Sequence, residues 1–128
     1  MNLLLDTHIL LWVAAGKLPK KVAELIAVDG NTVLFSTASI WEITIKNSLG
    51  RSDFQVDVNA LYNGFLNNGY TELTINSRHS IIAGTLPPIH KDPFDRILAA
   101  QAQYEKATLV TCDDILAEYP CSIIYIKP

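Results

Sequence analysis

Four acidic residues of this chain stand where a parallel sheet would gather them at one edge. They are Asp6, Glu42, Asp95 and Asp113. Asp6 and Asp113 directly follow short apolar runs, and Glu42 lies about a helical turn past such a run. Asp95 stands at the start of a long helical pattern. In open α/β sheets, ligands bind beyond the carboxyl ends of the strands. No Lys or Arg is placed to neutralise each acid in turn, so crowding would raise their pKa values. A divalent cation that prefers oxygen ligands, Mg²⁺ or Mn²⁺, would remove that cost.

Each of these acids also has an interpretation as a helix cap. Asp6 and Asp113 can cap the segments that follow them, and Asp95 can complement a helix dipole. Glu42 matches the capping box S-x-x-E with Ser39, which would place it in the first turn of a helix. Since Asn caps about as well as Asp, an Asp-to-Asn change separates the two interpretations: stability should stay within about 1 kcal/mol, while a charge that metal binding needs is lost.

The stretch from residue 90 to 114 predicts how two of the acids meet. Asp92 before Pro93 is typical of a helix start. A helix from Asp95 to Lys106 would climb roughly 16 Å at ~1.5 Å per residue. A strand from Thr108 to Asp113 would then descend roughly 16 Å at ~3.3 Å per residue. The two carboxylates, 18 positions apart, are therefore predicted to lie at one edge of one sheet.

Short apolar runs alternate with helical patterns along the rest of the chain. Strands are also expected at Asn2 to Leu5, Val33 to Ser36, Thr71 to Ile75 and Ser122 to Ile126. Helices are expected at Ile9 to Ala15, Pro19 to Val28, Ser39 to a stop at Gly50, Val58 to Leu66, and Ser77 to about Gly84. This alternation predicts an α/β sandwich around a mainly parallel sheet, in one domain spanning residues 1 to 128.

Composition narrows the class of protein. The chain has 128 residues, 49% of them apolar, which is enough for one core without disulfides or a structural metal. Cys112 and Cys121 match no metal or redox spacing, so we expect two reduced, mostly buried thiols. No basic leader precedes Asp6 and no apolar run approaches the ~18 residues of a membrane span, so we expect a cytoplasmic protein. A net charge of −3 argues against bulk attraction to nucleic acid.

Three blocks of sequence resemble one known family. The runs LLLDTHILLW, STASIWEITIKNSLGR, and LPPIHKDPFDRILAAQA followed by LVTCDD are similar to the PIN-domain family, specifically to the VapC-type toxin ribonucleases of toxin-antitoxin pairs. The resemblance covers nearly the whole chain. It implies a PIN-like three-layer α/β/α sandwich and a metal-dependent ribonuclease in which Asp6, Glu42, Asp95 and Asp113 form the acidic quartet. Asp6 and Asp95 are the foremost metal ligands, and Asp114 is an alternative to Asp113.

The implied reaction is hydrolysis of an RNA phosphodiester by an activated water, which Glu42 could orient or deprotonate. Candidate contacts to the RNA are Thr7, Lys46, Arg51, Lys91, Arg96 and Thr111. The two threonines could bind a carboxylate or a phosphate, with turn formation as a further alternative, and Lys46 could be an i+4 partner of Glu42. His8 and His90 are interpreted as surface hydrogen-bonding residues, and Trp12 and Trp41 as core residues.

Two rival functions remain open from the sequence. A receiver-like phospho-acceptor module shares the layering and an acidic pocket, but it needs an acidic pair after its first strand, where Asp6 stands alone. A catalytically inactive PIN-like binding subunit is the other. The resemblance further implies that a cognate antitoxin covers the acidic pocket and that the protein forms a homodimer through its N-terminal helices.

Overall fold

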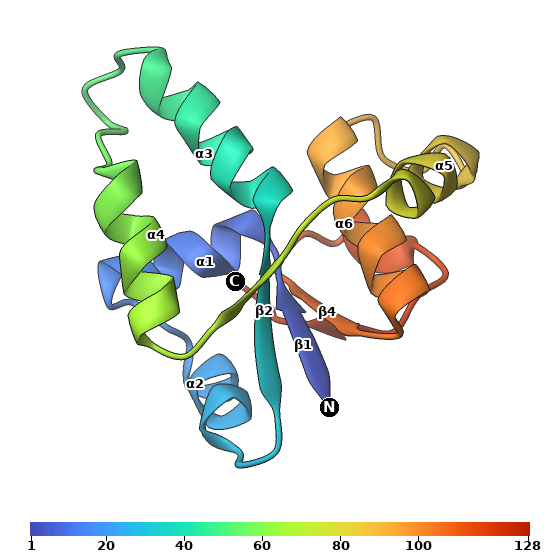
Figure 1. Ribbon diagram of the computed structural model, residues 1–128, viewed down its shortest axis with the longest axis horizontal. Helices are drawn as coiled ribbons and strands as arrows, with labels where there is room; N and C mark the ends of the chain where they lie inside the picture. Colours follow the sequence, from blue (N-terminus) through green and yellow to red (C-terminus); the bar gives the residue numbers. More distant parts are fainter.

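Five short strands form a single parallel sheet at the centre of the molecule (Figure 1). The structure is a computed structural model that describes every residue from 1 to 128. In chain order the strands are β1 (Asn2–Leu5), β2 (Thr32–Ser36), β3 (Thr71–Leu73), β4 (Thr108–Thr111) and β5 (Ile123–Tyr125). Their order across the sheet is β3-β2-β1-β4-β5, and every adjacent pair is parallel. The first strand is therefore central, and the ends of β2, β1 and β4 lie next to one another.

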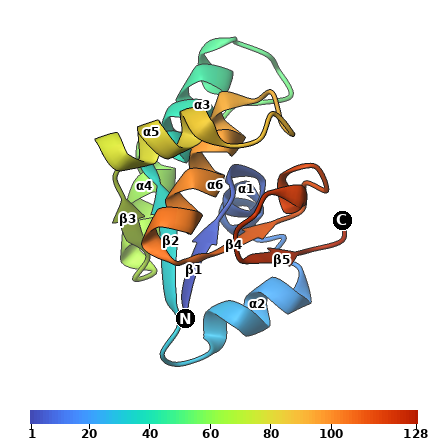
Figure 2. The same ribbon diagram turned by 90° about the vertical axis from the view of Figure 1, so that its right-hand side faces the viewer.

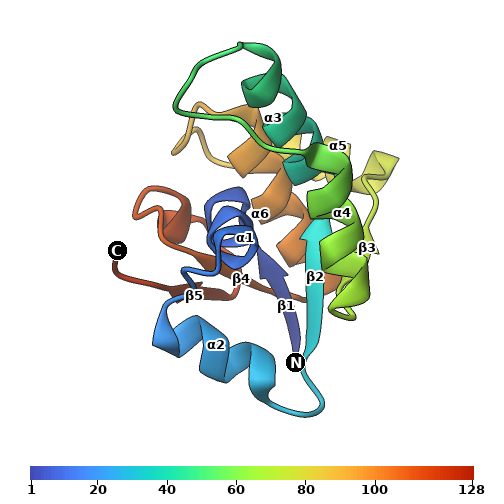
Figure 3. The same ribbon diagram turned by 90° about the vertical axis from the view of Figure 1, so that its left-hand side faces the viewer.

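Six α-helices and one 3₁₀ turn connect these strands. They are α1 (Thr7–Ala15), α2 (Lys20–Ala27), α3 (Thr37–Ser48), α4 (Val58–Asn67), α5 (Ser77–Thr85), α6 (Pro93–Glu105) and η1 (Leu116–Glu118). The sheet thus lies between two helical layers, as Figures 2 and 3 show from opposite sides. The predicted three-layer α/β/α sandwich is confirmed, with a sheet that is wholly rather than mainly parallel. None of these helices is both long and apolar enough to cross a membrane.

Alternating residues of the strands pack into two separate hydrophobic cores, one on each face of the sheet. Leu3 and Leu5 of β1 pack in a cluster with apolar side chains from α1, α2, α3 and α4. Leu4, which points to the opposite face, packs in a second cluster with Leu98 and small residues of α6 and with Leu86 after α5. Both faces of a parallel sheet are covered, which is why its strands read as continuous apolar runs instead of alternating ones.

Several predicted boundaries were wrong by a few residues. The cap of α3 is Ser36, whose side chain accepts from the backbone N–H of Ala38, and not Ser39, because the helix begins directly where β2 ends. Asn76 rather than Ser77 caps α5, in a capping box with His79. The strand β3 stops at Leu73 because its last partner on β2 is Ser36 and the chain beyond that residue is helical.

The strand order also bears on the rival functions. Receiver-like modules belong to the doubly wound folds with strand order 2-1-3-4-5. The order found here, 3-2-1-4-5, places β1 between β2 and β4 instead. The strand order therefore argues against a receiver-like phospho-acceptor module.

Candidate metal centre

The four predicted acids line one cleft at the carboxyl ends of β1, β2 and β4. Its volume is about 420 Å³, and two more acids lie on its wall. The acidic lining residues are Asp6, Glu42, Asp92, Asp95, Asp113 and Asp114. Lys46 is the one Lys or Arg on this wall. A larger hollow of about 540 Å³ lies against α1 and α4, but most of its lining is apolar and its one acid is Asp57. The chemistry-bearing residues are thus concentrated in the smaller cleft.

Asp6 is held rigidly where β1 passes into α1. Its carboxylate caps α1 by accepting the backbone N–H of Ile9 at 2.8 Å, and it accepts a short hydrogen bond from the hydroxyl of Thr111. Asp6 is only 3% exposed, and this burial raises the pKa of its carboxyl despite those two donors. Asp6 is therefore both the predicted helix cap and a member of the acidic cluster.

Glu42 reaches the cleft from the second turn of α3. The predicted first-turn position was wrong, because α3 begins at Thr37, two residues before the expected cap. One carboxylate oxygen accepts a hydrogen bond from the hydroxyl of Thr7 at 2.7 Å, and the other lies 3.5 Å from Nζ of Lys46. The expected i+4 pair is therefore present. Glu42 is fixed by neighbours on α1 and on its own helix.

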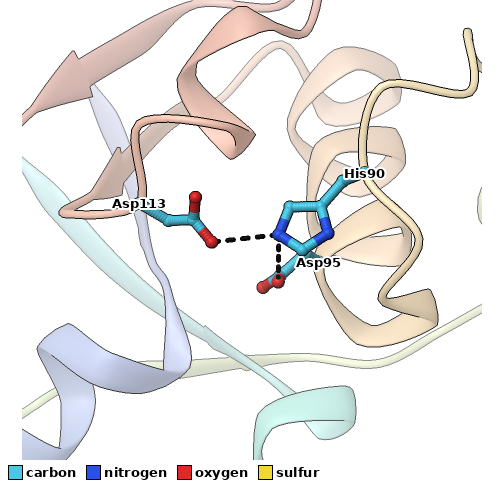
Figure 4. Close-up of side chains that lie close together, drawn as sticks. All are labelled: His90, Asp95 and Asp113. Atoms are coloured by element: carbon cyan, nitrogen blue, oxygen red, sulfur yellow. Dashed lines mark hydrogen bonds and ion pairs between the residues drawn. The ribbon is translucent and has the colours of Figure 1, made fainter.

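Asp95 and Asp113 share a single histidine nitrogen (Figure 4). Nε2 of His90 lies 3.0 Å from Oδ2 of Asp95 and 3.0 Å from Oδ2 of Asp113. Asp113 also caps the following turn, since its Oδ1 accepts from the backbone N–H groups of Ile115 and Leu116. The predicted return of β4 to the level of the start of α6 is confirmed by these contacts.

The environment shifts the pKa values of these groups in opposite directions. Burial, together with the nearby charges of Asp92, Glu42 and Asp113, raises the pKa of Asp95 from 3.8 to about 7, although His90 opposes the shift. Burial would also raise the pKa of Asp113, but hydrogen bonds from His90 and from two backbone amides outweigh it and lower the pKa. Ionising Asp95 in this surrounding is therefore costly.

His90 was not assigned to the site from the sequence. Its side chain is 16% exposed and lies between two carboxylates, so the interpretation as a surface residue was wrong. A histidine two residues before a capping Asp carries no local signal that it points toward a strand end 23 positions away. The structural contacts alone reveal its place.

The donor set fits a hard divalent cation. Mg²⁺ and Mn²⁺ take oxygen ligands, keep several waters and need only a few direct carboxylates. The cleft offers carboxylates from four separate elements, and one oxygen each of Asp95 and Asp113 lies with Nε2 of His90 within 4.8 Å of one another. A cation would also offset the repulsion that raises the pKa of Asp95.

The predicted threonine contacts go to carboxylates. Thr7 is 5% exposed and donates to Glu42, and its hydroxyl lies 2.9 Å from the hydroxyl of Ser39. Thr111 is fully buried and donates to Asp6. The predicted hydrogen bond to a carboxylate is therefore present for both threonines. Thr111 also forms the predicted turn contact, since its Oγ1 accepts the backbone N–H of Asp113 at 3.0 Å. These hydroxyls therefore orient acidic side chains.

The four predicted basic contacts lie in different places. Lys46 lines the cleft with 49% of its side chain exposed. Arg51 pairs with Asp53 at 2.9 Å outside the cleft, and Lys91 is exposed but is not part of its wall. The guanidinium of Arg96 donates to the carbonyls of Ala83, Leu86 and Pro87, so its donors are occupied by the backbone.

The two tryptophans are less buried than predicted. Trp41 is 61% exposed on α3, so its assignment to the core was wrong; its ring meets Phe94 edge to face at 5.3 Å. Trp12 is half-buried, lines the cleft and makes a similar contact with His8, which is exposed, at 4.8 Å. The helical spacing of an aromatic residue did not determine which face it takes.

Comparison with known proteins identifies the family. The family model described as "PIN domain" matches residues 3–120, nearly the full length of the chain. The chain belongs to the PIN domain family. The acidic cleft is therefore a feature of a PIN domain, and the resemblance in the three sequence blocks is confirmed at the level of the family. No curated protein matches the chain.

Several solved structures share this PIN fold. VapBC2 from Rickettsia felis, bound to a DNA fragment from its promoter, has 20% identity and a TM-score of 0.77 over 99% of this chain and 100% of that one. DNA-bound VapBC from Salmonella typhimurium has 18% identity and a TM-score of 0.74, covering 98% of both chains. VapBC-1 from nontypeable Haemophilus influenzae has 21% identity and a TM-score of 0.68, also covering 98% of both.

Proposed function

We propose that this PIN domain is a Mg²⁺- or Mn²⁺-dependent ribonuclease that hydrolyses RNA phosphodiester bonds. One observation carries the proposal: carboxylates from four separate elements meet in a single cleft with one lysine on its wall. Keeping these carboxylates ionised side by side costs free energy unless a cation binds between them, as the raised pKa of Asp95 indicates. Folding stability alone gives no reason to gather these charges.

Within this function, Asp6 and Asp95 are the principal ligands of the ion. Asp6 is presented by Thr111 and the first turn of α1, so it offers its remaining lone pairs from a fixed position. When bound, the divalent ion supplies a water of lowered pKa and neutralises charge on the phosphate. Glu42, held by Thr7, orients or deprotonates the attacking water.

Lys46 is the side chain best placed to bind a phosphate of the RNA. It is half-exposed at the edge of the cleft, and its partner Glu42 lies 3.5 Å away, which is a weak contact that a phosphate can replace. Lys46→Ala should therefore weaken RNA binding while leaving Mn²⁺ binding intact. Arg51→Ala, a change outside the cleft, is the matched control and should leave both unchanged.

Asp113 is the fourth acid of this proposal, ahead of its neighbour Asp114. Asp113 contacts His90 and two backbone amides, whereas the side chain of Asp114 is exposed. Asp113→Asn should reduce RNA cleavage and Asp114→Asn should leave it near wild type. The reverse result would move the role to Asp114.

We also propose that the protein is the toxin of a toxin-antitoxin pair, with a cognate antitoxin that covers the acidic cleft. The likeness of its fold to the VapBC structures supports a partner of this kind. Such a partner should inhibit cleavage of RNA and should bind less well when Asp6 or Asp95 is changed to Asn. Homodimerisation through α1 and α2 and a cytoplasmic location remain predictions from the sequence.

The deciding experiment is incubation of the purified, antitoxin-free protein with total RNA. Cleavage should require Mg²⁺ or Mn²⁺, should stop on addition of EDTA, and should be absent in the Asp95→Asn variant. Cleavage that persists in EDTA would contradict a metal-dependent mechanism. Mn²⁺ binding by a folded protein that cleaves no RNA would favour the alternative of an inactive PIN-like binding subunit.

A further inference from the structure

The imidazole of His90 occupies the space between two of the acids in the cleft. Its Nε2 contacts Oδ2 of both Asp95 and Asp113 at 3.0 Å (Figure 4). A nitrogen in such a place has two possible roles toward a divalent ion. It can bind the ion through its lone pair, or it can carry a proton and donate that proton to the acids. The position of the ring's hydrogen decides between them.

The other ring nitrogen determines that position. The backbone N–H of Asp92 donates to Nδ1 of His90 at 3.1 Å, so Nδ1 presents a lone pair and carries no proton. In a neutral imidazole the proton then lies on Nε2, which can only donate. The carboxylates raise the pKa of His90, but a second proton on Nδ1 would break the contact with the Asp92 amide. The geometry therefore describes a hydrogen-bond donor to Asp113, with Oδ2 of Asp95 at 3.0 Å from the same nitrogen.

The backbone of His90 is anchored independently of the acids. Its N–H donates to the hydroxyl of Tyr119 at 2.8 Å, and Tyr119 is only 4% exposed. Arg96 donates to the same hydroxyl at 3.2 Å and also to the carbonyl of Pro87 in the preceding loop. His90 is thus held by contacts of its own, with the Tyr119 hydroxyl and the Asp92 amide, and its position does not depend on the acids alone.

We propose that His90 is a positioning residue of the metal centre and not one of its ligands. Its Nε2–H donates to Oδ2 of Asp113 and lies against Oδ2 of Asp95. The imidazole thereby holds the two carboxylates together in spite of their like charge and leaves their remaining lone pairs for the ion. Histidines and other groups in this outer position typically change metal affinity by roughly 10- to 100-fold. This inference rests on the proposed metal-dependent function and adds a residue to it.

Two substitutions of His90 separate the role of its donor, Nε2–H, from that of its acceptor, Nδ1. Gln places an amide N–H near the position of Nε2, so His90→Gln retains a donor to the acids. Asn places an oxygen near the position of Nδ1, so His90→Asn retains the acceptor for the Asp92 amide but loses the donor. The two variants are similar in size and polarity, which makes each the control for the other in folding.

The test is the affinity of each purified protein for Mn²⁺, measured by electron paramagnetic resonance titration without RNA. His90→Asn should bind Mn²⁺ roughly 10- to 100-fold more weakly than wild type, and His90→Gln should bind close to wild type. Unchanged binding by His90→Asn would overturn the proposal. Tighter binding would also overturn it, because His90 would then compete with the ion for the acids.

A second measurement tests the proton directly. Long-range ¹⁵N–¹H correlation spectra of the histidine rings should show His90 with its proton on Nε2, both before and after Mg²⁺ is added. Loss of that proton when the ion binds would make His90 a ligand and refute the assignment. If wild type bound no Mn²⁺ at all, the proposed function would fail together with this inference, whereas equal binding by wild type and His90→Asn would defeat this inference alone.

Discussion

Replacing Asp95 by Asn should reveal the cost of the acidic cluster as a change in stability with pH. Burial and three neighbouring carboxylates raise the pKa of Asp95 from 3.8 to about 7. Asn has nearly the same shape, and its oxygen can still lie against Nε2 of His90. The substitution therefore removes the charge while keeping the main contact.

The sign follows from proton linkage. The folded protein holds the proton of Asp95 more tightly than the unfolded chain does, so this group lowers the free energy of unfolding as pH rises from about 4 to about 7. A change in pKa from 3.8 to about 7 corresponds to about 4 kcal/mol at 1.36 kcal/mol per pH unit. That figure is an upper bound, since 18% of the side chain is exposed to water. In EDTA, Asp95→Asn should gain up to about 4 kcal/mol on wild type between pH 4 and pH 8.

Mn²⁺ should reduce the stability advantage of Asp95→Asn at pH 8. An ion present at 100 times its Kd adds about 2.7 kcal/mol to the stability of a protein that binds it only when folded. Wild type should gain this stabilisation from Mn²⁺, and Asp95→Asn should not. The assay is urea denaturation of both proteins at pH 5 and pH 8, with EDTA or Mn²⁺. If the difference in stability between wild type and Asp95→Asn in EDTA did not change with pH, ionisation of Asp95 would carry no cost. If Mn²⁺ stabilised both proteins equally, Asp95 would not be a ligand.

Three further substitutions test separate parts of the structure. Asp6→Asn should keep the cap of α1, with stability within about 1 kcal/mol of wild type, yet lose stabilisation by Mn²⁺ and RNA cleavage; retained cleavage would contradict its role. Arg96→Lys should lower the free energy of urea unfolding by about 1.5–3 kcal/mol, because the single nitrogen of an ammonium cannot replace the two guanidinium nitrogens that reach the three carbonyls; an unchanged value would show the guanidinium to be dispensable. His79→Ala should lower the free energy of unfolding by about 1–3 kcal/mol, because it removes the hydrogen-bond partner of the Asn76 backbone N–H and of the Glu105 carboxylate. Its Mn²⁺ affinity should equal that of wild type; weaker Mn²⁺ binding would show that α5 influences the metal centre.

The elements that carry the site were largely predictable because their signals are local. Asp92 caps α6 with Pro93 after it, as expected, and the cap depends on the two residues themselves. The helix α4, from Val58 to Asn67, was predicted from the spacing of its apolar residues alone. Rise per residue placed Asp95 and Asp113 at one level before any contact was known.

The contacts within the site were not predictable in the same way. Thr111 and Asp6 are 105 positions apart, and their hydrogen bond exists because β1 lies beside β4 in the sheet. The exposure of Trp41 and the use of Arg96 by three backbone carbonyls likewise depend on how α3, α5 and α6 are placed. No spacing in the sequence encodes these neighbours.

By itself, the sequence determined the family, the alternation of strands and helices, and the acids that reach the carboxyl edge of the sheet, because periodicity and capping act over a few residues. Tertiary structure alone decided which oxygens are already occupied and that His90 stands between Asp95 and Asp113. The physical reason is that hydrogen bonds between distant segments depend on the order of strands across the sheet, and that order is set by packing of the whole chain.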